Sequence, residues 1–126
     1  MDKKEFLENL EYYIEFLLFD RDEIFENDMI SQYHIYREEI DKGLKVHRIS
    51  DEKNVVLKEA DNAYMRDIKK ILPLWEQDGI YFLREKYKDV ITKEMWYWWI
   101  DEIVKGEYPI EMIPDHLKKE VEQYYK

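Results

Sequence analysis

The sequence predicts an all-α fold, a single-domain irregular bundle of five or six helices that takes in residues 1–126. Apolar residues recur at helical spacing along most of the chain, and no segment shows the alternation of a half-buried strand. The 3 glycines and 3 prolines are scattered rather than gathered into a linker. A chain of 126 residues with 45% hydrophobic residues is suited to one domain with one core.

The first two helices are predicted in the N-terminal part of the chain. Asp2 followed by Glu5 is a capping-box pattern, so the first helix begins there, with the core stripe Phe6, Leu10, Tyr13 and Leu17. The second helix is expected to stop at Gly43, a usual C-terminal glycine, and its stripe is Met29, Tyr33, Tyr36 and Ile40. Residues 22–30 are either the lead-in to this helix or a separate turn.

A third helix is expected to begin at a Ser50 cap and to end at Pro73. Its stripe consists of Leu57, Ala60, Tyr64, Ile68 and Ile71. Residues 73–88 fit a helix interrupted at Gly79 better than they fit a strand.

The C-terminal part predicts two more helices. Thr92 caps a helix that continues to residue 105 and ends at Gly106. Residues 108–113 are expected to be extended around Pro109, and a last short helix begins at Pro114 or Asp115.

The net charge of −10 is concentrated near the N-terminus. Residues 1–41 hold 13 acids and 4 bases, a balance of −9, whereas residues 42–75 hold 5 acids and 8 bases, a balance of +3. Such a field repels phosphate backbones, so we expect no generic nucleic-acid binding and regard a basic protein partner as easier to accommodate. The acidic N-terminus does not resemble a signal peptide, and no apolar run suits a membrane helix, so a cytoplasmic location without membrane binding is expected.

Two groups of aromatic residues are candidates for partner binding. Tyr12, Phe16 and Phe19 form a second apolar face on the first helix, which needs a second neighbour, in the same chain or in a partner. Trp98 is predicted to point to the polar side of its helix. It is either covered by the return at residues 108–109 or exposed as a contact anchor.

Asp61 is the candidate for a buried polar pair, because it lies within the apolar stripe of the third helix. An unpaired buried carboxylate is costly, and Arg37 at the edge of the second stripe is its expected partner. Exposure at an end of the bundle and a catalytic role in a pocket are the alternatives.

No metal site or cofactor is predicted. The chain has no cysteine, and its three hydroxyl residues other than tyrosine, Ser31, Ser50 and Thr92, lie near expected caps or turns. His34, Glu38 and Asp41 share one helical face, but without a Glu-x-x-His pair this is typical of a solvated face. A basic set surrounds the connection to the third helix: Lys42, Lys45, His47, Arg48 and Lys53. A solvated loop is the default interpretation, and binding of an anion or of the acidic first helix of another copy is the alternative.

These observations favour a non-enzymatic, acidic protein–protein interaction module that can self-associate. An antitoxin or immunity-type protein that masks a basic nuclease is one alternative, suggested by size and charge. A small helical enzyme with a polar pocket around Asp61 and Arg37 is the other.

Overall fold

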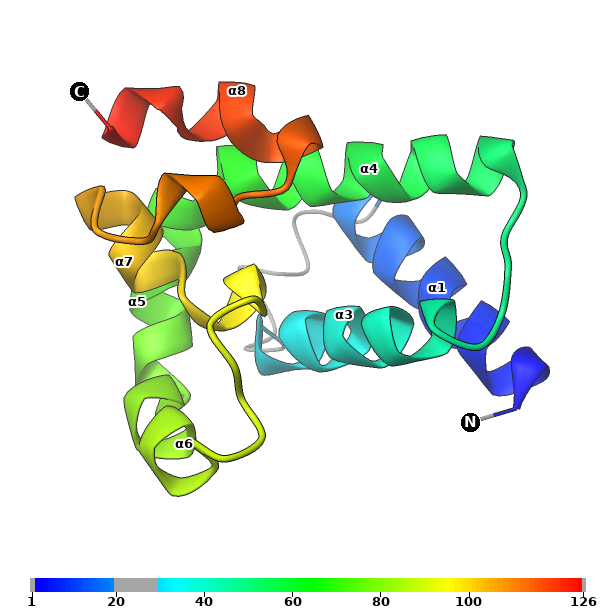
Figure 1. Ribbon diagram of the computed structural model, residues 1–126, viewed down its shortest axis with the longest axis horizontal. Coiled ribbons are helices and arrows are strands. Elements are labelled where there is room, and N and C mark those ends of the chain that lie inside the picture. The colour runs from blue at the N-terminus through cyan, green and yellow to red at the C-terminus, as the bar shows by residue number, and fades with distance from the viewer. Residues whose placement is uncertain (1, 20–29, 126) are drawn as a thin grey trace. The chain divides into compact units, whose positions relative to one another are not determined.

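The all-α prediction is confirmed. The computed structural model describes residues 2–19 and 30–125, and within these ranges it contains seven α-helices, four short 3-10 helices and no strand (Figure 1). The number of α-helices is slightly higher than the five or six expected, because segments predicted as single helices are divided. No helix within the described ranges has the length and apolar character required to cross a lipid bilayer.

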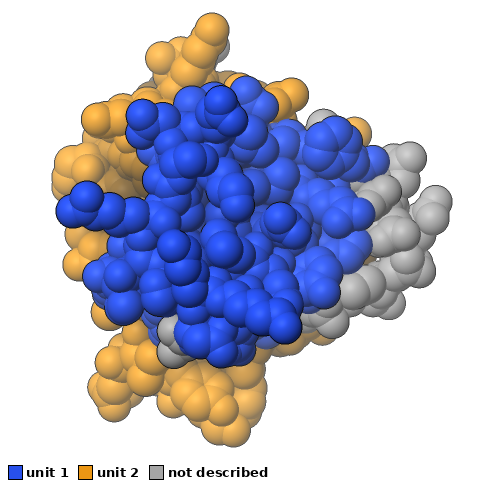
Figure 2. All heavy atoms as spheres, turned by 90° about the vertical axis from the view of Figure 1, so that its right-hand side faces the viewer, with its two compact units in different colours: residues 1–64 blue, residues 65–126 orange. Residues whose placement is uncertain are grey.

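The chain divides into two compact units, residues 1–64 and residues 65–126 (Figure 2). We call them unit 1 and unit 2 and describe each by itself. The single domain expected from the sequence stays a prediction.

Unit 1 is built from α1 (Lys3–Leu18), α3 (Ile30–Leu44) and most of α4 (Asp51–Arg66). α1 and α3 pack along each other, and the core includes the predicted stripe of α1. Both predicted N-terminal caps are confirmed, because the amide of Glu5 donates to the Asp2 carboxylate at 2.7 Å and that of Lys53 donates to the Ser50 hydroxyl at 3.2 Å.

Gly43 does not terminate its helix as expected. α3 continues to Leu44, and Gly43 is buried inside its last turn. The physical reason for a glycine here is the approach of α1, since a Cβ atom at this position would lie 2.1 Å from a ring carbon of the fully buried Phe6. Gly43 is therefore a site of close helix packing.

Unit 2 begins with α5 (Ile68–Gln77) and α6 (Ile80–Lys86). Pro73 lies inside α5, so the expected helix end at this proline is wrong. The helix instead breaks earlier, at Asp67, whose backbone carbonyl accepts hydrogen bonds from the amides of Lys70 and Ile71, both at 2.9 Å. The predicted interruption at Gly79 is confirmed, and its φ of 74° places it in the left-handed region.

The helix predicted to begin at Thr92 is shorter than expected. Residues 92–95 form turns, the 3-10 helix η1 (Trp96–Trp98) follows, and α7 covers Ile100–Lys105. The predicted end at Gly106 is confirmed. Gly106 has a φ of 71°, and a Cβ there would lie 2.3 Å from the backbone oxygen of Tyr124.

The C-terminal segment consists of short helical turns. Residues expected to be extended around Pro109 include the 3-10 helix η2 (Ile110–Met112). The predicted last helix is confirmed after Pro114, as η3 (Asp115–Leu117), α8 (Lys118–Val121) and η4 (Glu122–Tyr124). Residues 22–29, expected to be a lead-in or a separate turn, lie outside the described residues. Met29 of the second stripe is among them.

We expect Gly43→Ala to destabilise the protein, although alanine favours a helix over glycine by about 1 kcal/mol. Overpacking against Phe6 should outweigh that gain and lower the free energy of unfolding by about 1 to 3 kcal/mol, as measured by chemical denaturation. Lys42→Ala, at the exposed neighbouring position, is the control. A Gly43→Ala variant more stable than the parent would show that the ring of Phe6 moves aside freely.

Candidate functional site

Asp61 is a fully buried carboxylate in unit 1 that accepts hydrogen bonds from two other helices. Arg37 on α3 donates from Nε to Oδ1 at 2.8 Å and from Nη2 to Oδ2 at 3.1 Å. Tyr13 on α1 donates its hydroxyl proton to Oδ1 at 2.6 Å. The Nη1 atom of Arg37 donates to Asp41 at 2.6 Å. The structure therefore brings together the expected pair and adds Tyr13 and Asp41, which were not predicted as its partners.

The electrostatics of this cluster keep each group in the protonation state that its hydrogen bonds require. Burial, together with the adjacent Asp61 charge, raises the pKa of Tyr13 well above its ordinary value, so the hydroxyl remains a donor. Burial by itself would lower the pKa of Arg37, but the Asp61 and Asp41 carboxylates outweigh it and hold that pKa above its ordinary value. The cluster is thus a charged pair with its hydrogen bonds made inside the fold.

His34 is also buried on α3. Burial lowers the pKa of His34 from its ordinary value of 6.5 to about 4, so the folded protein holds it neutral at physiological pH. The face that His34 shares with Glu38 and Asp41 was expected to be solvated, and for His34 this is wrong, because its side chain is buried. No cluster of three potential metal ligands occurs in the described part of the chain.

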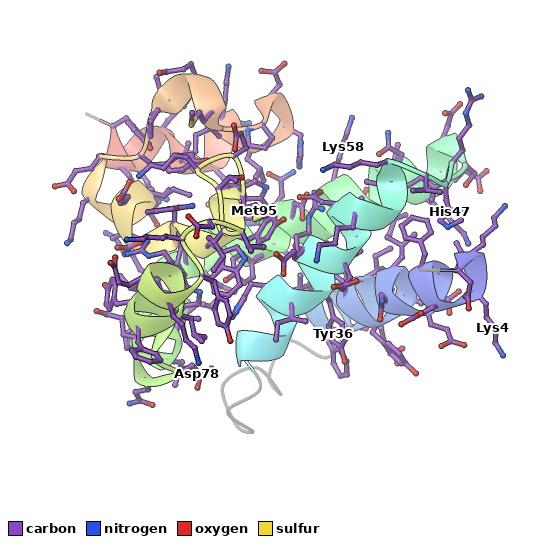
Figure 3. All side chains as sticks on the ribbon, turned by 60° about the horizontal axis from the view of Figure 1, so that its bottom comes forward. Lys4, Tyr36, His47, Lys58, Asp78 and Met95 are labelled. Atoms are coloured by element: carbon purple, nitrogen blue, oxygen red, sulfur yellow. The ribbon has the colours of Figure 1, made fainter. Side chains whose placement is uncertain are left out.

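The predicted second face of α1 is divided rather than continuous. The Tyr12 side chain is 46% exposed, and its ring lies 6.0 Å from that of Tyr36, where α1 and α3 lie side by side (Figure 3). Phe16 is half-buried. Phe19 is 76% exposed and borders a pocket with Glu11, Ile14 and Glu15. Tyr12 therefore packs on the α3 side, and Phe19 adjoins a separate surface.

That surface follows α1, and its first part is also bordered by α4; we call the two parts together the α1–α4 groove. Its first part has a volume of about 200 Å³, and its second part has a volume of about 510 Å³ and includes Phe19. The two parts share Glu11 and Ile14. The apolar lining comes from Leu10, Ile14, Val56 and Phe19, and the charged lining from Glu11, Glu15, Glu52 and Lys53. An apolar groove with carboxylates at its border is suited to an apolar side chain flanked by cations.

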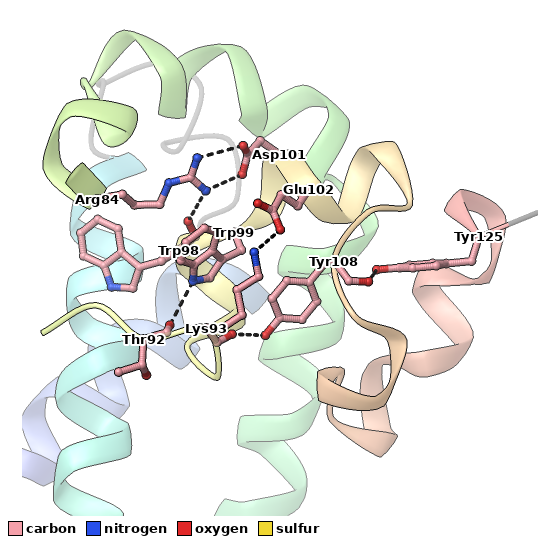
Figure 4. A network of polar contacts seen from close by, with 9 residues as sticks. All are labelled: Arg84, Thr92, Lys93, Trp98, Trp99, Asp101, Glu102, Tyr108 and Tyr125. Atoms are coloured by element: carbon pink, nitrogen blue, oxygen red, sulfur yellow. Dashed lines mark hydrogen bonds and ion pairs between the residues drawn. The ribbon is translucent and has the colours of Figure 1, made fainter. Parts of the chain in front are cut away.

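Trp98 is not the exposed anchor that the sequence allowed, because it is 6% exposed in unit 2. The prediction placed it on a regular α-helix, whereas η1 and the preceding turns rotate the side chains of this segment differently. Its backbone carbonyl accepts a hydrogen bond from Arg84 at 3.2 Å (Figure 4). We therefore exclude the Trp98 ring from the surface contact residues.

Arg84 organises a polar cluster in unit 2 that was not predicted from the sequence. Its guanidinium group forms two hydrogen bonds with Asp101, at 2.8 and 3.0 Å (Figure 4). It also lies 4.4 Å from the centre of the Trp99 ring, and Lys93 lies 3.9 Å from that centre. Arg84 and Asp101 are 17 residues apart in the sequence, so helical spacing provided no signal for the pair.

Further hydrogen bonds fix the segment that carries Lys93. Lys93 is ion-paired with Glu102, and the Tyr108 hydroxyl donates to the Lys93 backbone carbonyl (Figure 4). The Tyr125 hydroxyl donates to the Tyr108 carbonyl at 2.6 Å. These contacts explain how an irregular segment is held in unit 2, and they make it a structural cluster rather than a site.

Comparisons with protein-family models, curated proteins and solved structures found no significant match for this chain.

We expect the loss of one partner of the buried pair to destabilise unit 1 strongly. Asp61→Asn leaves Arg37 without its buried counter-charge and should lower the free energy of unfolding by about 3 to 5 kcal/mol. Tyr13→Phe removes one hydrogen bond to a charged acceptor and should cost about 1.5 to 3 kcal/mol. Asp41→Asn, at a partly exposed partner, should cost less than about 1 kcal/mol. Equal effects of Asp61→Asn and Asp41→Asn in chemical denaturation would contradict this account.

The buried His34 should make stability decrease in mild acid. Its pKa is about 4 when folded and 6.5 when exposed, so the unfolded chain binds the extra proton between these values. Stability should fall as the pH drops through 6.5 and level off near 4, a loss of about 3 kcal/mol from this group. Denaturation curves of the parent and a His34→Gln variant between pH 7 and pH 4 test this. The same pH slope in both proteins would assign the loss to other groups.

Proposed function

We propose that this protein is an interaction module that binds a protein partner through the α1–α4 groove. The supporting observation is an open apolar lining that also holds three carboxylates, Glu11, Glu15 and Glu52, against one cation, Lys53. Glu11, Glu15 and Glu52 are exposed, and none of them forms an ion pair within the described residues. A partner that supplies cations and an apolar side chain would satisfy both parts of this surface.

The chemistry of Asp61 favours a binding function over the enzymatic alternative. A carboxylate that serves as a general base needs access to a substrate proton. Both oxygens of Asp61 already accept hydrogen bonds from Arg37 or Tyr13, and the side chain is fully buried. Neither part of the groove is lined by Asp61 or Arg37. The antitoxin or immunity-type alternative is a special case of the proposed function, in which the basic partner is a nuclease.

A synthetic peptide tests this proposal directly. The probe is an amphipathic helix whose apolar face is flanked by lysines, and a peptide with glutamates at the flanking positions serves as its counterpart. Fluorescence anisotropy should show binding of the lysine-flanked probe alone. Glu11→Lys combined with Glu15→Lys should weaken that binding about tenfold or more, because the border of the groove changes sign.

The matched control changes the net charge by the same amount as the groove variant, at positions far from the groove in the sequence. Glu111→Lys with Glu122→Lys reverses two exposed carboxylates in unit 2. This variant should bind the probe nearly as well as the parent. If both double variants lose affinity equally, the attraction is a property of net charge and the groove is not the site.

A further inference from the structure

The connection between α3 and α4 carries the opposite surface chemistry to the groove. Residues 42–50 contain three cations, Lys42, Lys45 and Arg48, and no acid. Lys42 lies 3.6 Å from Glu39, whereas Lys45 and Arg48 are exposed and form no ion pair within the described residues. Val46 lies between them and is 76% exposed. This connection presents an apolar side chain flanked by two cations.

The connection and the groove belong to the same unit and lie close along α1. The His47 ring stacks on Phe6 with the ring centres 5.5 Å apart, and Leu10, one helical turn beyond Phe6, belongs to the groove lining. On α4, the groove residues Glu52 and Lys53 follow directly after the connection. The two complementary surfaces are therefore neighbours on one chain.

We propose that the occupant of the α1–α4 groove is a second copy of this chain, with Val46 of each copy placed against the Leu10, Ile14 and Val56 lining of the other. Lys45 and Arg48 then meet Glu11, Glu15 and Glu52 across the interface. This inference rests on the proposed function of the groove and names its partner.

Adjacency of the two surfaces allows both contacts to form in one two-fold dimer. In a two-fold dimer, if residue i of one copy contacts residue j of the other, then j also contacts i. Because the connection lies beside the groove, the connection of each copy can occupy the groove of the other. This doubles the contact and closes the assembly at two copies. The local attraction has to overcome the repulsion between two chains that each carry a charge of −10. The paired opposite charges at the interface therefore decide whether association occurs.

Charge exchange tests the interface. Lys45→Glu with Arg48→Glu makes the connection acidic, and Glu11→Lys with Glu15→Lys makes the groove border basic. Each double variant alone places like charges at both contacts of its homodimer, so sedimentation should show a dimer Kd about tenfold or more above that of the parent. An equimolar mixture of the two variants should recover the dimer, because every contact in the mixed species again joins opposite charges.

The apolar contact has its own control. Val46→Asp should weaken the dimer, whereas Phe82→Asp, at a 68% exposed apolar residue in unit 2 that also has a neighbouring lysine, should leave the dimer Kd unchanged. Circular dichroism melting of every variant verifies that the substitutions at exposed positions leave the fold intact. Equal losses for Val46→Asp and Phe82→Asp would overturn the proposal, since they would indicate unspecific association.

Three other results would also overturn it. These are a parent that stays monomeric at all concentrations, a mixture of charge variants that stays monomeric, or species larger than a dimer, which a closed two-fold contact does not allow. A monomeric parent that still binds the lysine-flanked probe would reject the second copy as occupant and retain the groove as a binding site. A monomeric parent that also ignores the probe would reject both.

Discussion

The side chain of Asp61 is the constraint on which unit 1 depends. A carboxylate without exposure to water is stable only if opposite charge and hydrogen-bond donors reach it, and an uncompensated charge costs several kcal/mol. The donors come from α1 and α3 while the acceptor is on α4, so the helices must adopt one rotation and one register to bring these groups within 3.1 Å. The apolar stripes supply most of the driving force for packing. Asp61 makes one rotation and register of the helices more stable than the alternatives.

Much of this arrangement could be predicted because it follows from local chemistry. The caps at Asp2 and Ser50 and the left-handed Gly106 are set by residues within a few positions of each other. Asp61 could be assigned a cation because charge in an apolar stripe has few alternatives. Its tyrosine partner was harder to predict, since a Tyr13 hydroxyl on a core stripe has no signature that distinguishes it from an ordinary aromatic ring.

The failures came from contacts between segments distant in sequence. Gly43 resembles a helix terminator until the ring of Phe6 is placed against it. Trp98 was placed on the polar side of an α-helix from Thr92, either covered or exposed, but tertiary contacts at Lys93, Arg84 and Asp101 stabilise turns and a 3-10 helix in that segment. The α1–α4 groove was missed for the same reason, because the helical periodicity of α1 does not show which face α4 leaves uncovered. Local patterns predict an element well only where its neighbours do not alter it.

The distribution of indole groups has a spectroscopic consequence. All four tryptophans, Trp75, Trp96, Trp98 and Trp99, lie in unit 2, and residues 1–64 contain tyrosine and phenylalanine as their aromatic groups. Emission excited at the red edge of the protein absorbance therefore originates from one unit, while the far-ultraviolet dichroism of the helices comes from both. With Arg84 and Lys93 close to the Trp99 ring, that emission is also sensitive to the loss of this cation contact. Tryptophan emission thus reports on unit 2, and its comparison with the dichroism shows whether residues 1–64 unfold together with unit 2.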